Sequence, residues 1–106
     1  MGVLVSVTSR HDLAHLSVMG ELDAFTALQL RRRISAALAH GCRFFTVDLE
    51  DLTFVDAGGL SAFVELRNAA HLVEGSVTFV DVSPSFRRTC RSAGLTEAFH
   101  LDPAAR

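Results

Sequence analysis

Four carboxylates lie close together in the middle of the chain, in a pattern that could hold a divalent cation. Asp48 belongs to an apolar stretch of strand length, and Glu50, Asp51 and Asp56 lie in the loop that follows it. Carboxylate oxygens are the preferred ligands of Mg²⁺ and Ca²⁺, and α/β folds commonly place their sites at the carboxyl ends of strands. Asp56 also suits the N-cap of a helix, and loop carboxylates are ordinarily solvated. We favour capping for Asp56 and predict no metal site, with cation binding as the alternative.

The junction from Asp56 to Gly59 is where we expect the functional site, because it leads into the first turn of a helix. A helix start carries unpaired backbone N–H groups and the positive end of the helix dipole. Such a position can receive an anion, a phosphate-containing ligand or a protein partner. Ala57 and Gly58 occupy the two positions whose side chains decide which of these the site can receive, and neither carries a hydroxyl group.

Signatures of catalysis are missing from the sequence. The chain has no lysine, which excludes a phosphate-binding loop of the Gly-Lys-Ser/Thr kind. Ser61 follows Leu60 inside the predicted helix and does not stand between the glycines of a nucleophile elbow. His11 and His15 have the spacing of a helical metal pair but fall on a turn and a strand. We predict a protein that is not an enzyme and needs no metal or cofactor.

Length and charge indicate one domain over residues 1–106, with a core from about residue 3 to 101. Only 21% of the residues are charged and the formal net charge is -2, which argues against a nucleic-acid partner. No apolar run approaches the roughly 18 residues of a membrane span, and Met1 to Arg10 lacks the features of a signal peptide. These properties predict a cytoplasmic protein. They leave open whether it is a monomer or a dimer.

Two kinds of hydrophobic pattern alternate along the chain. Strand-length stretches that run apolar or alternate with polar residues are residues 3–8, 13–19, 44–49 and 77–82. Apolar residues recur every three or four positions, as in amphipathic helices, in residues 24–40, 57–73 and 84–93. Strand, helix and strand in that order imply a parallel crossover and hence an α/β domain. The short segment 95–101 is expected to be part strand, and a frayed tail is expected from Pro103 onward.

Helix ends and faces follow from the same pattern. We expect Asp23 to cap the first helix and Gly41 to end it, and Ser83-Pro84 to start the third. The second helix should bury Gly59, Phe63, Leu66, Ala70 and Val73. The third should bury Phe86, Cys90 and Ala93. The polar residues of the first helix, expected to be solvated, are Gln29, Arg31, Arg32, Arg33 and Ser35.

Two cysteines, Cys42 and Cys90, lie far apart in a chain without an export signal. Free thiols are therefore expected. A redox pair is the alternative, although Cys90 falls on an apolar helix face, where a thiol is inert.

Three stretches in register resemble the STAS domains of the anti-sigma factor antagonist family, over nearly the whole chain. They are Gly20-Glu21-Leu22-Asp23, then Val47-Asp48-Leu49 running on to Phe54-Val55-Asp56 and Gly59-Leu60, and Asp81-Val82-Ser83-Pro84 leading to Gly94-Leu95. The resemblance implies a mixed sheet of four to five strands with helices packed on one face. It also implies a regulatory role: binding a histidine-kinase-like anti-sigma factor so that a sigma factor is released.

The resemblance further implies where a switch would sit. In switched members the anti-sigma partner phosphorylates a serine or threonine just before the glycine that matches Gly59. Gly58 occupies that position here and has no hydroxyl, so phospho-switching is not expected; Ser61 and Thr53 have a different geometry. Losing the acceptor removes a negatively charged off switch. The partner-binding residues implied are Asp23, Asp56, Ala57, Gly58, Gly59, Leu60 and Ser61.

An alternative function remains within the same resemblance. The chain could be a structural subunit of a larger assembly, such as a lipid-transport ATPase complex or a stress-sensing complex. Constitutive assembly needs no phosphorylation, so the absence of a hydroxyl at Gly58 favours this alternative.

Overall fold

The computed structural model describes residues 2–101, and the tail expected from Pro103 onward lies outside this range. Five strands form one mixed sheet in the order β1-β2-β3-β5, with β4 paired to β2 beyond the end of β3. The strands are β1 (Val3–Arg10), β2 (Leu13–Leu22), β3 (Phe44–Asp48), β4 (Leu52–Val55) and β5 (Ser76–Val80). Only β1 runs antiparallel to its neighbour; β2 pairs in parallel with β3 and β4, and β3 with β5.

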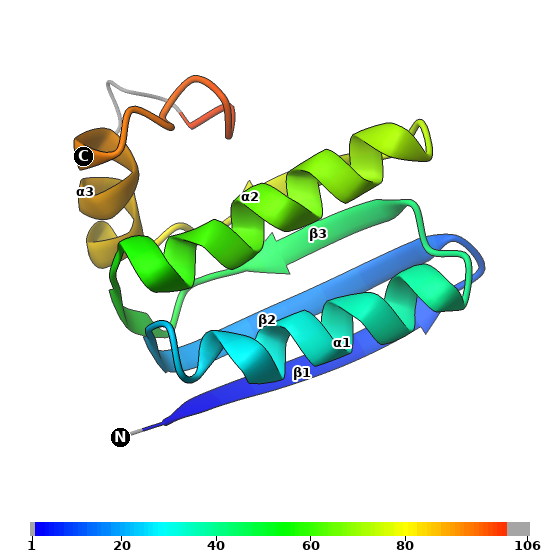
Figure 1. Cartoon of the computed structure of the whole chain (residues 1–106), viewed down its shortest axis with the longest axis horizontal. Coiled ribbons are helices and arrows are strands. Elements are labelled where there is room, and N and C mark those ends of the chain that lie inside the picture. The colour runs from blue at the N-terminus through cyan, green and yellow to red at the C-terminus, as the bar shows by residue number, and fades with distance from the viewer. Residues whose placement is uncertain (1, 102–106) are drawn as a thin grey trace.

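Two long helices cover one face of this sheet. They are α1 (Ala27–Ala39) and α2 (Ala57–Leu72), and they lie side by side over the sheet, running roughly along its strands (Figure 1). The shorter α3 (Pro84–Ser92) stands at the end of the sheet where β4 lies, and it packs on β4. This arrangement confirms the predicted α/β fold. None of the helices within the described range is long and apolar enough to cross a lipid bilayer.

The core lies between the sheet and the helices. Leu16 and Val18 of β2 are fully buried, whereas Leu13, on the opposite side of the same strand, is 54% exposed. An aromatic cluster closes the end of the core nearest α3, where Phe79 lies 5.5 Å from Phe63 and 4.7 Å from Phe99, measured between ring centroids. Aromatic pairs at this spacing add to the stability that burial provides.

Several local predictions were wrong. Residues 52–55, expected to be loop, form β4, because pairing with the end of β2 satisfies their backbone groups. Residues 96–100 form turns and no strand, since the Phe99 N–H donates to the Leu95 carbonyl in helical fashion. Val73 and Ala93 are exposed because each helix ends just before it.

The first helix also begins later than predicted. Its N-cap is Thr26, and Asp23 instead closes the turn that precedes the helix. Two of its arginines are bound and not simply solvated. Arg33 donates to the Val5 carbonyl of β1 at 2.9 Å, and Arg31 pairs with Glu65.

Candidate functional site

The start of α2 is built as its sequence predicts. Asp56 has extended backbone angles, and its carboxylate accepts a hydrogen bond from the Gly59 N–H at 2.9 Å. Among the described residues, the N–H groups of Ala57 and Gly58 have no hydrogen-bond partner. The first turn therefore presents two free donors and very little side chain.

The two glycines of this turn have different surroundings. Gly59 is buried, and a Cβ atom added there would overlap the main-chain carbonyl of Leu22 at the end of β2. Gly58 is half-buried, and its Cβ would lie 3.0 Å from the Cβ of Ala24. Gly59 is therefore required by the contact between α2 and the sheet, whereas a side chain at position 58 needs only a small shift of an exposed neighbour.

The turn from Asp23 to Thr26 lies beside Gly58. The Asp23 carboxylate accepts hydrogen bonds from the N–H groups of Phe25 and Thr26, each at 2.9 Å, and the Asp23 N–H donates to the Thr26 hydroxyl. The bond from the Thr26 N–H, above the other contributions, lowers the pKa of Asp23 below its ordinary value. This reciprocal pairing holds the turn closed and resembles a capping box.

A large apolar side chain projects from the same turn. Phe25 is 89% exposed, and Leu28, in the first turn of α1, is 49% exposed. Exposed aromatic residues of this kind commonly mark protein contact surfaces. Phe25 was not among the predicted site residues, although an aromatic residue inside a polar turn is a signal that could have found it.

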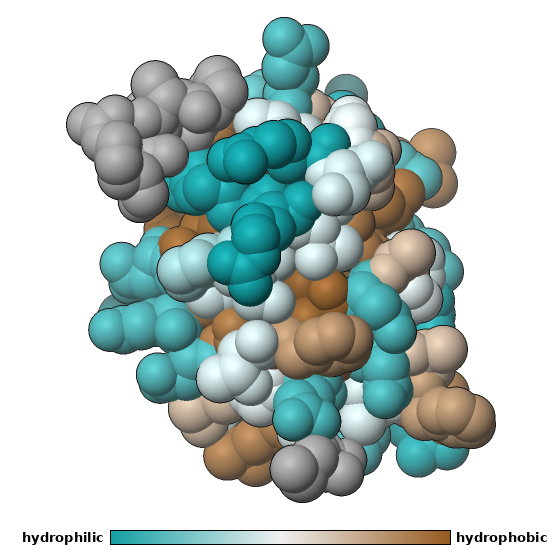
Figure 2. All heavy atoms as spheres, turned by 90° about the vertical axis from the view of Figure 1, so that its left-hand side faces the viewer, coloured by the Kyte–Doolittle hydropathy of each residue, from teal (hydrophilic) through white to brown (hydrophobic). Residues whose placement is uncertain are grey.

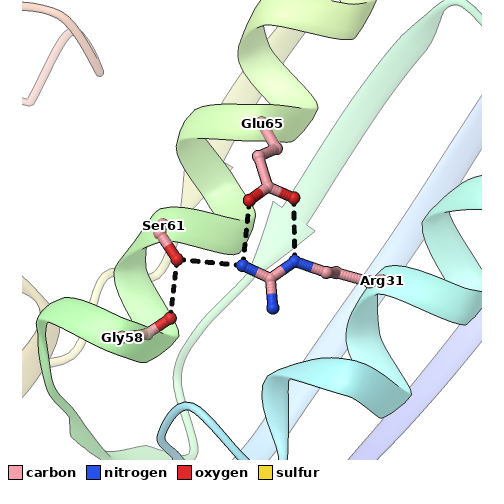
Figure 3. A network of polar contacts seen from close by, with 4 residues as sticks. All are labelled: Arg31, Gly58, Ser61 and Glu65. Atoms are coloured by element: carbon pink, nitrogen blue, oxygen red, sulfur yellow. Dashed lines mark hydrogen bonds and ion pairs between the residues drawn. The ribbon is translucent and has the colours of Figure 1, made fainter.

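Ser61 belongs to a polar network that joins α1 to α2 (Figure 3). Its hydroxyl donates to the Gly58 carbonyl at 2.7 Å and accepts from Nη2 of Arg31 at 2.9 Å. Arg31 also makes a two-point ion pair with Glu65, through Nε at 2.8 Å and Nη2 at 2.9 Å. Glu65 lies 34 residues from Arg31 in sequence, so the local pattern gave no sign of this pairing.

The other side of the α2 start faces α3. An open hollow of about 500 Å³ lies between them, lined by Ala57, Arg88, Thr89, Ser92 and Ala93. The Thr89 hydroxyl donates to the Val55 carbonyl at 2.8 Å, which fixes α3 against the strand that leads into α2. Seen from this end, the most hydrophilic side chains gather over α3, with paler residues below (Figure 2).

The carboxylates are grouped differently from the prediction. Asp48 and Glu50 lie close to Asp81, with one oxygen of each within 4.8 Å of the others, whereas Asp56 serves as the cap of α2. Asp81 comes from the end of β5, which parallel pairing with β3 brings to the same edge of the sheet. Glu50 and Asp81 are exposed, as solvated carboxylates are.

Both cysteines are free thiols, as expected, and both are buried. Burial raises the pKa of Cys90 to about 12. A thiol with such a pKa is almost entirely protonated at neutral pH, which disfavours redox chemistry.

Fold and site together define the class of protein. A family model, the STAS domain, matches residues 5–105, and the chain belongs to this family. The Anti-sigma-B factor antagonist of Staphylococcus aureus (strain NCTC 8325 / PS 47) is 26% identical over 102 residues, covering 96% of this chain and 94% of the relative. The Anti-sigma F factor antagonist of Lysinibacillus sphaericus is 30% identical over 81 residues, covering 76% of this chain and 69% of the relative.

Solved structures agree with the sequence relatives. An anti-sigma factor antagonist from Mycobacterium paratuberculosis superposes with a TM-score of 0.78 and 26% identity, over 97% of this chain and 87% of that one. The unphosphorylated anti-sigma factor antagonist SpoIIAA has the same fold, with a TM-score of 0.79 and 22% identity, over 89% and 84% of the two chains. The chain is thus an anti-sigma factor antagonist-like STAS domain, and the sequence-based family assignment is confirmed.

Proposed function

We propose that this protein releases a sigma factor by binding a kinase-like anti-sigma factor in the cytoplasm. The interaction takes place on what we call the docking surface. It consists of the exposed or half-buried residues Asp23, Phe25, Asp56, Ala57, Gly58 and Ser61. Gly59 and Leu60, which the sequence also suggested as contact residues, are buried beneath this surface and are not part of it. The observation that carries the proposal is the α2 start, where the N–H groups of Ala57 and Gly58 have no partner among residues 2–101 and the neighbouring turn bears an almost fully exposed Phe25.

The docking surface is suited to binding without rearrangement. Asp56 caps α2, Asp23 closes its own turn, and the Arg31 network ties Ser61 to α1. A surface held in place before contact loses little conformational freedom on binding. The single large apolar group, Phe25, supplies the kind of aromatic anchor on which protein interfaces depend.

Binding to this surface is not switched by phosphorylation at the usual family position. Ala57 and Gly58 have no hydroxyl that could accept a phosphoryl group. Ser61 is the nearest hydroxyl on the helix, and it is already hydrogen-bonded to Arg31 and to the Gly58 carbonyl. The protein is therefore a constitutive antagonist, active whenever it is present.

Calorimetric titration against each kinase-like anti-sigma protein of the same genome tests this proposal. We expect one of them to bind, and Phe25→Ala to weaken that binding at least about tenfold, which corresponds to about 1.4 kcal/mol. Leu72→Ala is a matched control, because Leu72 is 86% exposed at the far end of α2. This variant should bind the anti-sigma protein with the affinity of the wild-type protein. Absence of binding by every candidate would refute the proposal.

The lack of phospho-switching has its own test. After incubation with the anti-sigma partner and ATP, mass spectrometry should find no added phosphate on the wild-type protein. Gly58→Ser should gain one phosphate and then bind more weakly, because the exposed Ala24 can move to admit the new side chain. Phosphate on Ser61 of the wild-type protein would contradict the proposed constitutive state.

A second candidate function is that of a structural subunit in a larger assembly. The missing hydroxyl at Gly58 favours it, because a permanent contact needs no switch. Neighbouring genes discriminate the two functions: a transporter permease and ATPase indicate an assembly subunit, and a kinase-like regulator or sigma factor indicates an antagonist.

A further inference from the structure

We propose that α3 extends the docking surface with a basic face that receives an acidic segment of the partner protein. The inference rests on the proposed function, since it concerns the same partner. α3 has three arginines among its nine residues and no acidic residue. Phe86 and Cys90 are buried, so the helix turns its apolar face to the core, while Arg88 and Arg91 are exposed.

These two arginines have no partner within the described part of the molecule. The side chains of Arg88 and Arg91 make no hydrogen bond or ion pair with residues 2–101. Arg31, Arg33 and Arg43, by contrast, are each bound to a carboxylate or a carbonyl. The guanidinium groups of Arg88 and Arg91 are exposed and have no partner among residues 2–101, so they can meet an external anion.

The basic face is continuous with the docking surface. Arg88 lines the hollow that Ala57 closes on its other side. Ala57 places the positive dipole end of α2 at the edge of this hollow, and that end favours an anion as the arginine does. Because Thr89 is bonded to Val55, the backbone of α3 that carries the arginines keeps a fixed position relative to the α2 start. A partner seated on Ala57 and Gly58 thus lies within reach of Arg88.

The chemistry favours a short acidic segment of a protein over a long polyanion. The exposed carboxylates of Glu50 and Asp81 lie close to each other at one edge of the sheet. Asp81 comes only three residues before Pro84, where α3 begins. A nucleic acid or an anionic membrane would meet this negative cluster, whereas a few aspartates or glutamates on a protein would not. The formal net charge of -2 also disfavours a long polyanion as the partner.

Titration with a hexaglutamate peptide, followed by amide NMR, tests the basic face without the natural partner. We expect shifts at Arg88, Arg91, Ala57 and Gly58, which are lost in the double variant Arg88→Gln/Arg91→Gln. The control is Arg10→Gln/Arg32→Gln, which removes the same charge from exposed positions elsewhere and should keep the shifts. No shifts on α3, equal effects of both variants, or tighter binding of duplex DNA or phosphatidylserine vesicles through α3 would overturn the proposal.

Titration with the anti-sigma protein separates this inference from the proposed function. If the wild-type protein binds, Arg88→Gln/Arg91→Gln should weaken binding about tenfold at low salt, with a shallower salt dependence, because such charges act mainly on association. Unchanged affinity would place the partner away from α3 and overturn the inference while the proposed function stands. If no anti-sigma protein binds the wild type, the proposed function fails, and the peptide titration decides whether α3 receives acidic segments.

Discussion

Gly59 in the first turn of α2 packs directly on the main-chain carbonyl of Leu22 at the end of β2. A Cβ atom at position 59 would overlap that carbonyl and lie 2.9 Å from the Leu22 Cγ. Because the obstacle is backbone within the sheet, it cannot move aside. We expect Gly59→Ala to lower the free energy of unfolding by about 1–3 kcal/mol, as overpacking does. Urea unfolding followed by circular dichroism measures the change.

Gly58→Ala is the matched control for that substitution. Its Cβ would lie 3.0 Å from the Cβ of Ala24, an exposed residue of the neighbouring turn. A small shift of the turn relieves this contact, and alanine favours a helix over glycine by up to about 1 kcal/mol. We expect the two effects to leave the unfolding free energy within about 1 kcal/mol of wild type. Equal losses for both variants would contradict the distinction between the glycines.

The ion pair between Arg31 and Glu65 should contribute modestly to stability. Both side chains are partly exposed, at 34% and 58%. A double-mutant cycle of Arg31→Ala and Glu65→Ala should give a coupling of about 0.2–1 kcal/mol, as exposed pairs do. Raising the salt concentration should shrink this coupling, because salt screens exposed charges. The cycle of Arg32→Ala with Glu65→Ala is the control, with a coupling near zero.

Asp23 should titrate at lower pH than an ordinary aspartate. The hydrogen bond from the Thr26 N–H lowers its pKa in the folded protein. As the pH falls, the Asp23 carboxylate is therefore protonated in the unfolded chain before it is protonated in the folded protein. The stability that the charged Asp23 gives the folded protein is fully present above the unfolded-state pKa of about 3.9. It is lost as the pH falls through the folded-state pKa. Carboxyl NMR titration checks the direction; a midpoint for Asp23 at or above the ordinary aspartate value of about 3.9 would contradict it.

Cys90 should resist modification while the protein is folded. Its thiol is buried, and burial raises its pKa to about 12. We expect a thiol-specific reagent at pH 7 to label it only at the rate of unfolding, because the thiolate is the reactive form. Cys90→Ser is the control that identifies the labelled site. Rapid labelling of Cys90 in the absence of denaturant would reopen the redox alternative.

The sequence predicted the long elements well because their apolar periodicity is strong. Phe63 and Leu66 fall on one helical face, and both are buried in the structure. The short strand β4 has only four residues, too few to show a period, and it is recognisable only from its pairing with β2. Ser83-Pro84 correctly predicted the start of the helix at 84–92. The Ser83 hydroxyl caps this helix by accepting a hydrogen bond from the Phe86 N–H.

Side-chain contacts at the site were predictable only where they are local. Asp56 and Gly59 are three residues apart, and their hydrogen bond follows from capping chemistry. Arg31 and Glu65 meet only because α1 and α2 are neighbours, and Asp81 reaches Asp48 only because β3 and β5 pair. These contacts depend on tertiary arrangement, which periodicity along the chain does not encode.

Ala57 and Gly58 offer a partner little besides main-chain atoms. Under the proposed function, the centre of the contact would look nearly the same in any antagonist with this backbone, whatever its sequence. Such a centre gives affinity without selectivity, because main-chain groups do not differ between paralogues. Discrimination among several anti-sigma factors in one cell then falls to the margin of the contact, to Phe25 on one side and Arg88 on the other. Exchanging Phe25 and Arg88 for the corresponding residues of a paralogue would therefore change which anti-sigma factor the protein binds.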